Sequence, residues 1–114
     1  MTDFQEREHA FEAKFAHDEE FRFLVIARRD KLFAQWAAER LRLSDQARTD
    51  LTASVLAVRD DKRHDEALLK QVADAFTEHG SSLPERELAA ALNDCAAQAR
   101  QQLLDKPPGT PAAP

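Results

Sequence analysis

Glycine and cysteine are scarce in this 114-residue chain, and their scarcity excludes two kinds of site. The two glycines, Gly80 and Gly109, are too far apart to form a glycine-rich loop around a phosphate group. The one cysteine, Cys95, has no partner for a disulfide and no second thiolate for a cysteine metal site. Because Cys95 stands at an apolar helical position near Leu92 and Ala99, we expect a buried thiol.

Long apolar runs and strand patterns are also missing. The apolar run FLVIA, at residues 23–27, is far shorter than the roughly 20 residues that cross a bilayer as a helix. Acidic side chains stand near the N-terminus, where a secretory signal carries basic ones. We therefore expect a cytoplasmic protein without membrane insertion. No segment alternates apolar and polar residues for long enough to predict a β-strand.

The chain also lacks a strongly basic surface. It has 16 Lys and Arg against 21 Asp and Glu, which gives a formal net charge of −5. Nucleic-acid backbones bind clustered basic side chains, and the basic concentration in this sequence is short. We therefore expect no nucleic acid as a partner, and we interpret Arg28, Arg29 and Lys31 as a solvated helix face.

Candidate catalytic and metal-binding groups form no recognisable pattern. A nucleophilic serine or cysteine needs a base and a positioning group, and no serine here stands in a turn typical of one. A metal site needs three or four converging donors; His17 and Glu20 can share a helix face, but no second pair follows. We predict no enzyme, no metal site and no cofactor. The residues considered are His9, His17, His64, His79, Ser44, Ser54, Ser81 and Ser82.

What the chain does contain is helix-forming sequence, rich in Ala, Leu, Glu, Arg and Gln. The predicted fold class is all-α: a four-helix bundle with a long N-terminal amphipathic helix or a partly disordered leader. Composition divides the chain into a leader segment at residues 1–20, a bundle domain at residues 21–104 and a tail at residues 105–114. Because the tail has four prolines and one glycine, we expect it to be disordered.

Local signals place the helix ends. The first helical pattern ends near Leu41, and Ser44 is a candidate N-cap for the second helix. The third helix begins at about Asp65 and stops at Gly80, where a left-handed C-terminal cap needs glycine. Residues 82–85 predict a capping box with an early proline at the start of the fourth helix.

Helices two to four are too short and too weakly apolar to persist alone, so we expect them to bury their stripes against the Trp36 end of the first helix. Trp36, Leu32 and either Leu24 or Val25 are the predicted anchors. The apolar stripe positions on the other helices are Ala47, Leu51, Val55, Val58, Leu68, Leu69, Val72, Phe76, Leu88, Leu92, Cys95, Ala99 and Leu103.

The first helical pattern changes sign along its length. Residues 1–20 carry seven acidic and two basic side chains, a net charge of −5, while residues 21–42 carry six basic and two acidic ones, a net charge of +4. Phe4, Phe11 and Phe15 are spaced by seven and four residues, so a helix places them on one stripe. An amphipathic segment of this kind is typical of a helix that binds in a groove.

Three segments of this pattern resemble a known family. FEAKFAHDEE at residues 11–20, ARR-x-KL at residues 27–32 and WAAE at residues 36–39 stand in the order and spacing of the alphaproteobacterial ATPase inhibitor zeta-subunit family. Weaker matches follow in the third and fourth helices, so the resemblance covers roughly residues 3–104.

The resemblance implies a four-helix fold whose N-terminal segment enters the catalytic head of the F-type ATP synthase. There it would lie between catalytic subunits and beside the central shaft, and block rotation during ATP hydrolysis. The bundle would dock outside, which makes the protein cytoplasmic and peripheral to the inner membrane. Our hypothesis for partner binding assigns apolar anchors and polar contacts to Phe4, Arg7, Glu8, Phe11, Lys14, Phe15, Asp18 and Glu19.

The chain departs from the family's pattern at residues 30–35, at Arg42 and at residues 24–26, and one alternative function stays open. Arg42 replaces the glycine usual after the first helix, which predicts that this helix extends further. The stretch at residues 24–26 is more apolar than is usual there. The alternative is a ligand-responsive helical bundle without inhibitory function, with adenine nucleotide as a candidate ligand. Nothing in the sequence identifies a nucleotide site.

Overall fold

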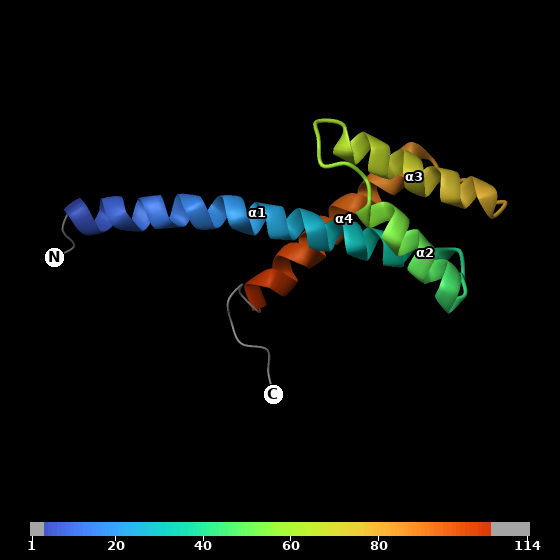
Figure 1. The fold of residues 1–114 in the computed structure, drawn as a ribbon, viewed down its shortest axis with the longest axis horizontal. Coiled ribbons are helices and arrows are strands. Elements are labelled where there is room, and N and C mark those ends of the chain that lie inside the picture. Colours follow the sequence, from blue (N-terminus) through green and yellow to red (C-terminus); the bar gives the residue numbers. More distant parts are fainter. Residues whose placement is uncertain (1–3, 106–114) are drawn as a thin grey trace.

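The computed structural model describes the backbone of residues 4–105 and the side chains of residues 18–105. Four helices account for most of it and no strand occurs among these residues, so the predicted all-α class is confirmed. In chain order they are α1 Phe4–Arg40, α2 Asp45–Leu56, α3 His64–Glu78 and α4 Glu85–Asp105 (Figure 1). The predicted proline-rich tail lies, except for Asp105, outside the described residues.

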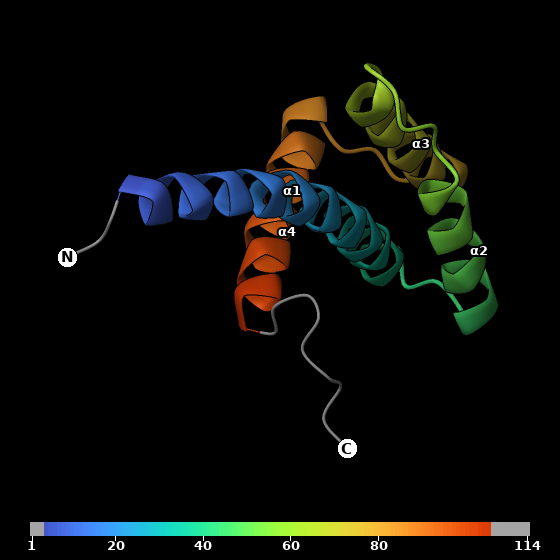
Figure 2. The same cartoon turned by 60° about the vertical axis from the view of Figure 1, so that its left-hand side comes forward.

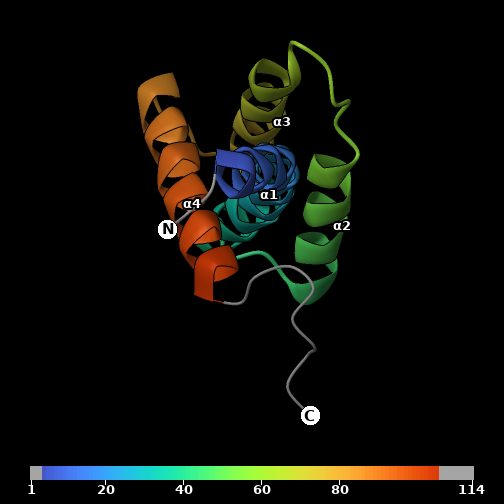
Figure 3. The same ribbon diagram turned by 90° about the vertical axis from the view of Figure 1, so that its left-hand side faces the viewer.

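Helix α1 organises the molecule. Its 37 residues correspond to a rod of about 55 Å. The view along α1 shows α4 on one side of it and α2 and α3 on the other (Figure 3), and α1 contacts all three. Only its C-terminal half is surrounded in this way. The N-terminal half projects beyond the other helices (Figures 1 and 2).

The core forms where the C-terminal half of α1 meets the other helices. Phe33 is fully buried there, together with Val55 of α2, Leu68 of α3 and Leu88 of α4. The predicted anchor Trp36 is only partly buried; its ring stacks on Phe33 with 5.6 Å between ring centroids. The prediction found the correct helix turn but missed Phe33, whose side chain points fully into the core. Phe burial of this kind contributes about 1.5–3 kcal/mol.

A second, smaller cluster lies between α1 and α4. Val25 of α1 is buried with Ala99 and Leu103 of α4, and Leu24 and Leu32 pack against them. Both residues offered as alternatives for this anchor position, Leu24 and Val25, therefore take part. Leu24 and Val25 of the apolar stretch thus attach α4 to the middle of α1.

Two of the predicted helix boundaries are confirmed. The Ser44 hydroxyl accepts a hydrogen bond from the Ala47 amide at 3.2 Å and caps α2. Gly80 has φ +73° after the end of α3, in the left-handed region, and the Ser81 amide donates back to the Phe76 carbonyl. This pattern is the Schellman motif, for which glycine is the preferred residue.

The predicted extension of α1 past Arg42 is wrong. The helix ends at Arg40, and Arg42 itself adopts the left-handed region with φ 54°. Its amide donates to the Glu39 carbonyl and the Leu43 amide donates to the Ala38 carbonyl, which completes the same Schellman motif without glycine. The hydrogen bonds and the packing of the following chain override the local preference of arginine for a right-handed conformation.

The predicted capping box of the fourth helix is also wrong. Helix α4 begins at Glu85, and the carbonyl of Pro84 accepts from the Leu88 amide at 3.2 Å. Pro84 therefore occupies the N-cap position instead of the first turn. Ser82 lies two residues earlier, too far from the helix for the capping-box contact with Glu85.

Candidate functional site

The eight predicted partner-binding residues belong to the projecting half of α1. The helix runs without interruption from Phe4, so one rod carries all of them. Asp18 and Glu19 are exposed, as partner binding requires. The side chains of the other six, which are Phe4, Arg7, Glu8, Phe11, Lys14 and Phe15, lie outside the described residues, and their role stays a prediction.

The Phe residues of the leader lie on the same face of α1 as the residues that α1 contributes to the core. Phe15 and Phe33 are separated by about five turns of 3.6 residues, which places them at the same angle around the axis of α1. At Phe33 the other helices cover this face completely. In the described part of the chain, no other helix lies beside the projecting N-terminal part of α1 (Figure 1). Arg22, which has nearly the same phase, is exposed at the boundary between the two halves.

The basic half of α1 divides into exposed and buried cations. Arg28 and Lys31 are exposed, and Arg28 donates to Gln102 of α4 at 3.1 Å. Arg29 is instead buried, with 9% of its surface exposed. The interpretation of Arg28, Arg29 and Lys31 as one solvated face is therefore wrong for Arg29. Arg29 stands four residues before Phe33, so helical spacing already placed it on the core side.

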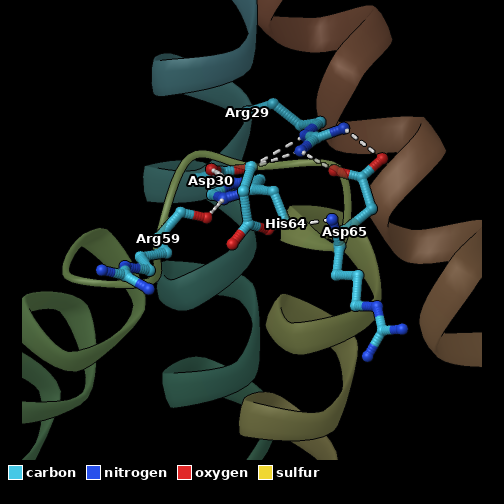
Figure 4. Close-up of polar contacts among 7 residues, drawn as sticks. Arg29, Asp30, Arg59, His64 and Asp65 are labelled. Carbon is cyan, nitrogen blue, oxygen red and sulfur yellow. Dashed lines mark hydrogen bonds and ion pairs between the residues drawn. The ribbon is translucent and has the colours of Figure 1, made fainter.

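Arg29 is held by two carboxylates (Figure 4). Its Nε donates to Oδ1 of Asp30 at 2.9 Å, and its Nη2 donates to Oδ1 of Asp65 at 2.7 Å. A second bond joins Nη1 to Oδ2 of Asp65 at 3.3 Å, so the contact with Asp65 is bidentate. Asp30 is 4% exposed, whereas Asp65 is open to solvent. These contacts tie α1 to the first turn of α3.

His64, the first residue of α3, completes the cluster. Its Nε2 lies 2.6 Å from Oδ2 of Asp30, and its Nδ1 lies 2.7 Å from the carbonyl oxygen of Arg59 in the α2–α3 loop (Figure 4). The sequence placed the start of this helix at about Asp65 and gave His64 no contact. The sequence offered no signal for this contact, because Asp30 and His64 are 34 residues apart.

The cluster shifts two pKa values in opposite directions. Burial lowers the pKa of His64, but the bonds to the Arg59 carbonyl and to Asp30, with the charges of Asp30 and Asp65, outweigh it and raise the pKa above 6.5. The hydrogen bond from Arg29 is the main reason that the pKa of Asp65 falls below 3.8. Two cations and two carboxylates thus balance at neutral pH when His64 is protonated.

Neither a metal site nor a reactive thiol is found among the described residues. No group of His, Cys, Asp and Glu side chains among residues 18–105 is arranged to hold a metal ion. Cys95 is buried as predicted, and burial is the main reason that the pKa of its thiol is raised, which disfavours the reactive thiolate. None of the described helices is long and apolar enough to cross a membrane.

A groove of about 510 Å³ lies between α2 and α3. Its lining includes three acidic side chains, Asp50, Asp74 and Glu78, together with His79. This concentration of negative charge repels phosphate groups. The groove therefore does not favour an adenine nucleotide.

A known protein family matches most of this chain. The model of the family described as "ATPase inhibitor subunit zeta" matches residues 1–102, which include the projecting half of α1 and nearly all of the bundle. No curated protein and no solved structure matched the chain. Because the family match spans most of the chain, including both halves of α1, this protein belongs to the ATPase inhibitor subunit zeta family.

Proposed function

We propose that this protein inhibits ATP hydrolysis by the F-type ATP synthase through insertion of residues 1–20 into the catalytic head. The inserted helix lies between catalytic subunits and beside the central shaft, where it blocks rotation. The bundle, residues 21–104, remains outside. The protein then resides in the cytoplasm, peripheral to the inner membrane. Family membership supports the inhibitory role.

The observation that carries the insertion mechanism is the projecting half of α1. Residues 4–20 correspond to about 25 Å of helix, which continues directly into the half that the bundle holds. A continuous helix transmits force between its two ends better than a flexible linker. An inserted segment that is joined in this way to a folded bundle can resist displacement by a turning shaft.

The energetics of insertion depend on the Phe stripe. Burial of Phe4, Phe11 and Phe15 in a groove would contribute on the order of 5 kcal/mol before ordering costs are subtracted. Polar residues on the flanks, including Asp18 and Glu19, then pair with groups that line the cleft and select its register. The acidic balance of residues 1–20 favours a cleft with basic lining.

The test is the ATP hydrolysis rate of the isolated catalytic head from the same organism. We expect inhibition by the full chain and none by a chain that lacks residues 1–18, while circular dichroism shows that the shortened bundle remains helical and cooperative. A matched control keeps residues 1–18 and changes Phe23, an exposed residue of the second half, to Ala. Equal inhibition by the full and the shortened chains would refute insertion.

The alternative, a ligand-responsive bundle without inhibitory function, predicts a different result in the same assay. Such a protein would leave hydrolysis unchanged, and it would keep its ligand after removal of residues 1–18. The acidic lining of the α2–α3 groove argues against adenine nucleotide as that ligand. No observation on the described helices favours this alternative over inhibition.

A further inference from the structure

The contact between His64 and its two neighbours requires an additional proton. The carbonyl oxygen of Arg59 can only accept, so Nδ1 of His64 carries a hydrogen. The carboxylate of Asp30 already accepts from Arg29 through Oδ1, and its Oδ2 faces Nε2 of His64 at 2.6 Å. Both ring nitrogens therefore act as donors, which is the arrangement of the charged imidazolium.

This proton joins three separate parts of the chain. Asp30 lies in α1, Arg59 in the α2–α3 loop, and His64 at the start of α3 (Figure 4). Val58 of the loop packs against the core, and the His64 side chain adds a polar connection from the loop to α1. The side chain of His64 is 13% exposed and that of Asp30 is 6% exposed, so water cannot easily replace the bond.

We propose that Asp30, His64 and the Arg59 carbonyl form a proton-operated latch. With the proton bound, the latch fixes the α2–α3 loop and the start of α3 against the middle of α1. When the proton leaves as the pH rises, a neutral imidazole cannot donate to both acceptors, and one of the two bonds is lost. The release is local, because the bidentate contact between Arg29 and Asp65 keeps its charges.

The charges around His64 determine the direction of the effect. Asp30 of α1 and Asp65 of α3 face it with negative charge, and Arg29 of α1 bonds both carboxylates. Loss of the proton leaves this set with one net negative charge, partly buried. Because the pKa of His64 is raised in the folded state, its contribution to stability is complete below pH 6.5 and is lost as the pH rises through the raised value.

The first test is direct observation of the imidazole in the full chain. We expect ¹⁵N NMR of the His64 ring to show both nitrogens mostly protonated at pH 6.5, and a titration midpoint above 6.5. Amide exchange in the α2–α3 loop, corrected for its intrinsic pH dependence, is expected to accelerate over the same titration. A His64 titration midpoint at or below 6.5, or a ring that is mostly neutral at pH 6.5, would overturn the proposal.

The second test measures urea unfolding of three proteins from about pH 5.5 to about pH 9. In the unmodified chain the unfolding constant should rise by up to about tenfold per pH unit within the His64 window. His64→Gln keeps a side-chain donor but cannot titrate, so this rise should disappear. His79→Gln is the matched control, because His79 bonds only within α3, to the Ala75 carbonyl.

The two variants separate the latch from general effects of histidine removal. An unchanged pH dependence of the unfolding constant in His64→Gln would refute the latch. Loss of this pH dependence in His79→Gln would also refute it, because the titrating proton would then belong to His79. If His64→Gln fails to fold, Asp30→Asn provides a second variant, which should lower the pKa of His64 in the NMR titration. These measurements use the protein alone, so they do not depend on inhibition of the ATP synthase.

Discussion

The two halves of α1 share one helical stripe but have different neighbours. In residues 21–40, the stripe runs through Phe33 and is covered by α2, α3 and α4. In residues 4–20 it runs through Phe11 and Phe15, and no other described helix lies beside it (Figure 2). A helix in water gains most of its stability from the packing of its apolar face. The first half therefore has the pattern of a buried helix, and none of the other described helices packs on it.

This difference separates two roles that a single helix pattern cannot distinguish. A phenylalanine in the second half should act on stability, and one in the first half should act on binding. Charged residues should divide in the same way: the buried Arg29 supports the fold, whereas Asp18 and Glu19 are available to a partner. Substitutions in the two halves can therefore show whether a residue supports the fold or binds the partner.

The largest expected effect is that of Phe33→Ala compared with Phe15→Ala. Because Phe33 is fully buried, its truncation should lower the free energy of unfolding by about 3–5 kcal/mol. Phe15→Ala should change that free energy by less than about 0.5 kcal/mol, and raise the concentration needed for half-inhibition by about tenfold or more. Urea unfolding and the hydrolysis assay measure the two quantities.

Phe23→Ala serves as the control for this pair, since Phe23 is 62% exposed in the second half of α1. It should alter neither quantity appreciably. If Phe15→Ala destabilises the protein as much as Phe33→Ala does, both halves of the stripe belong to the core, and the comparison fails.

A smaller effect is expected from Arg29→Met. The variant keeps an unbranched apolar stem but leaves the buried Asp30 carboxylate without its guanidinium partner, at a cost of about 3 kcal/mol. Arg22→Met, on the exposed boundary of the two halves, should cost less than about 0.5 kcal/mol. Thermal unfolding of both variants checks the difference. Equal melting temperatures would mean that Arg29 is as dispensable as a surface arginine.

The sequence predicted the fold well where the signals were local. Ser44 and Gly80 marked real helix ends, because a cap depends on one side chain or on one backbone conformation. Helical periodicity also located the buried faces of α3 and α4, including Cys95. The predictions for the helix ends at Arg42 and Pro84 were wrong. Hydrogen bonds of the surrounding backbone fixed both ends, against the conformational preference of the residue itself.

The polar cluster was predictable only in part. The phase of Arg29, one turn before Phe33, was visible, but a basic composition around it suggested a solvated face. Its partners Asp65 and His64 come from another helix, and no local pattern links residues so distant in the chain. The proposed partner-binding residues are the reverse case: family resemblance and periodicity indicated them, but the side chains of all except Asp18 and Glu19 lie outside the described residues, so they stay a prediction.

The ends of α1 and α3 can be compared through substitutions that should change the free energy of unfolding by about 1 kcal/mol. Arg42 and Gly80 occupy the same left-handed position of two Schellman motifs, with φ 54° and +73°. Arg42→Gly should therefore stabilise the protein and raise its melting temperature. Gly80→Ala should destabilise it by a similar amount, although a Cβ there would meet no atom within 4 Å. Since both sites lie in the bundle, inhibition should be unchanged; a loss of stability in Arg42→Gly would contradict this view.

The smallest expected effect concerns Asp65, whose side chain is largely exposed. Asp65→Asn should cost less than about 1 kcal/mol at neutral pH, because solvent screens its bonds to Arg29. The pKa of Asp65 is lowered in the folded state, so its contribution is present above 3.8 and is lost as the pH falls through the lowered value. The difference in unfolding free energy between the unmodified chain and Asp65→Asn should therefore shrink below pH 3.8. Glu19→Gln, at an exposed position in the first half of α1, should change the free energy of unfolding at neutral pH by less than about 0.5 kcal/mol and should instead weaken inhibition. A loss of stability in Glu19→Gln as large as that in Asp65→Asn would mean that the projecting half of α1 is held by the chain itself.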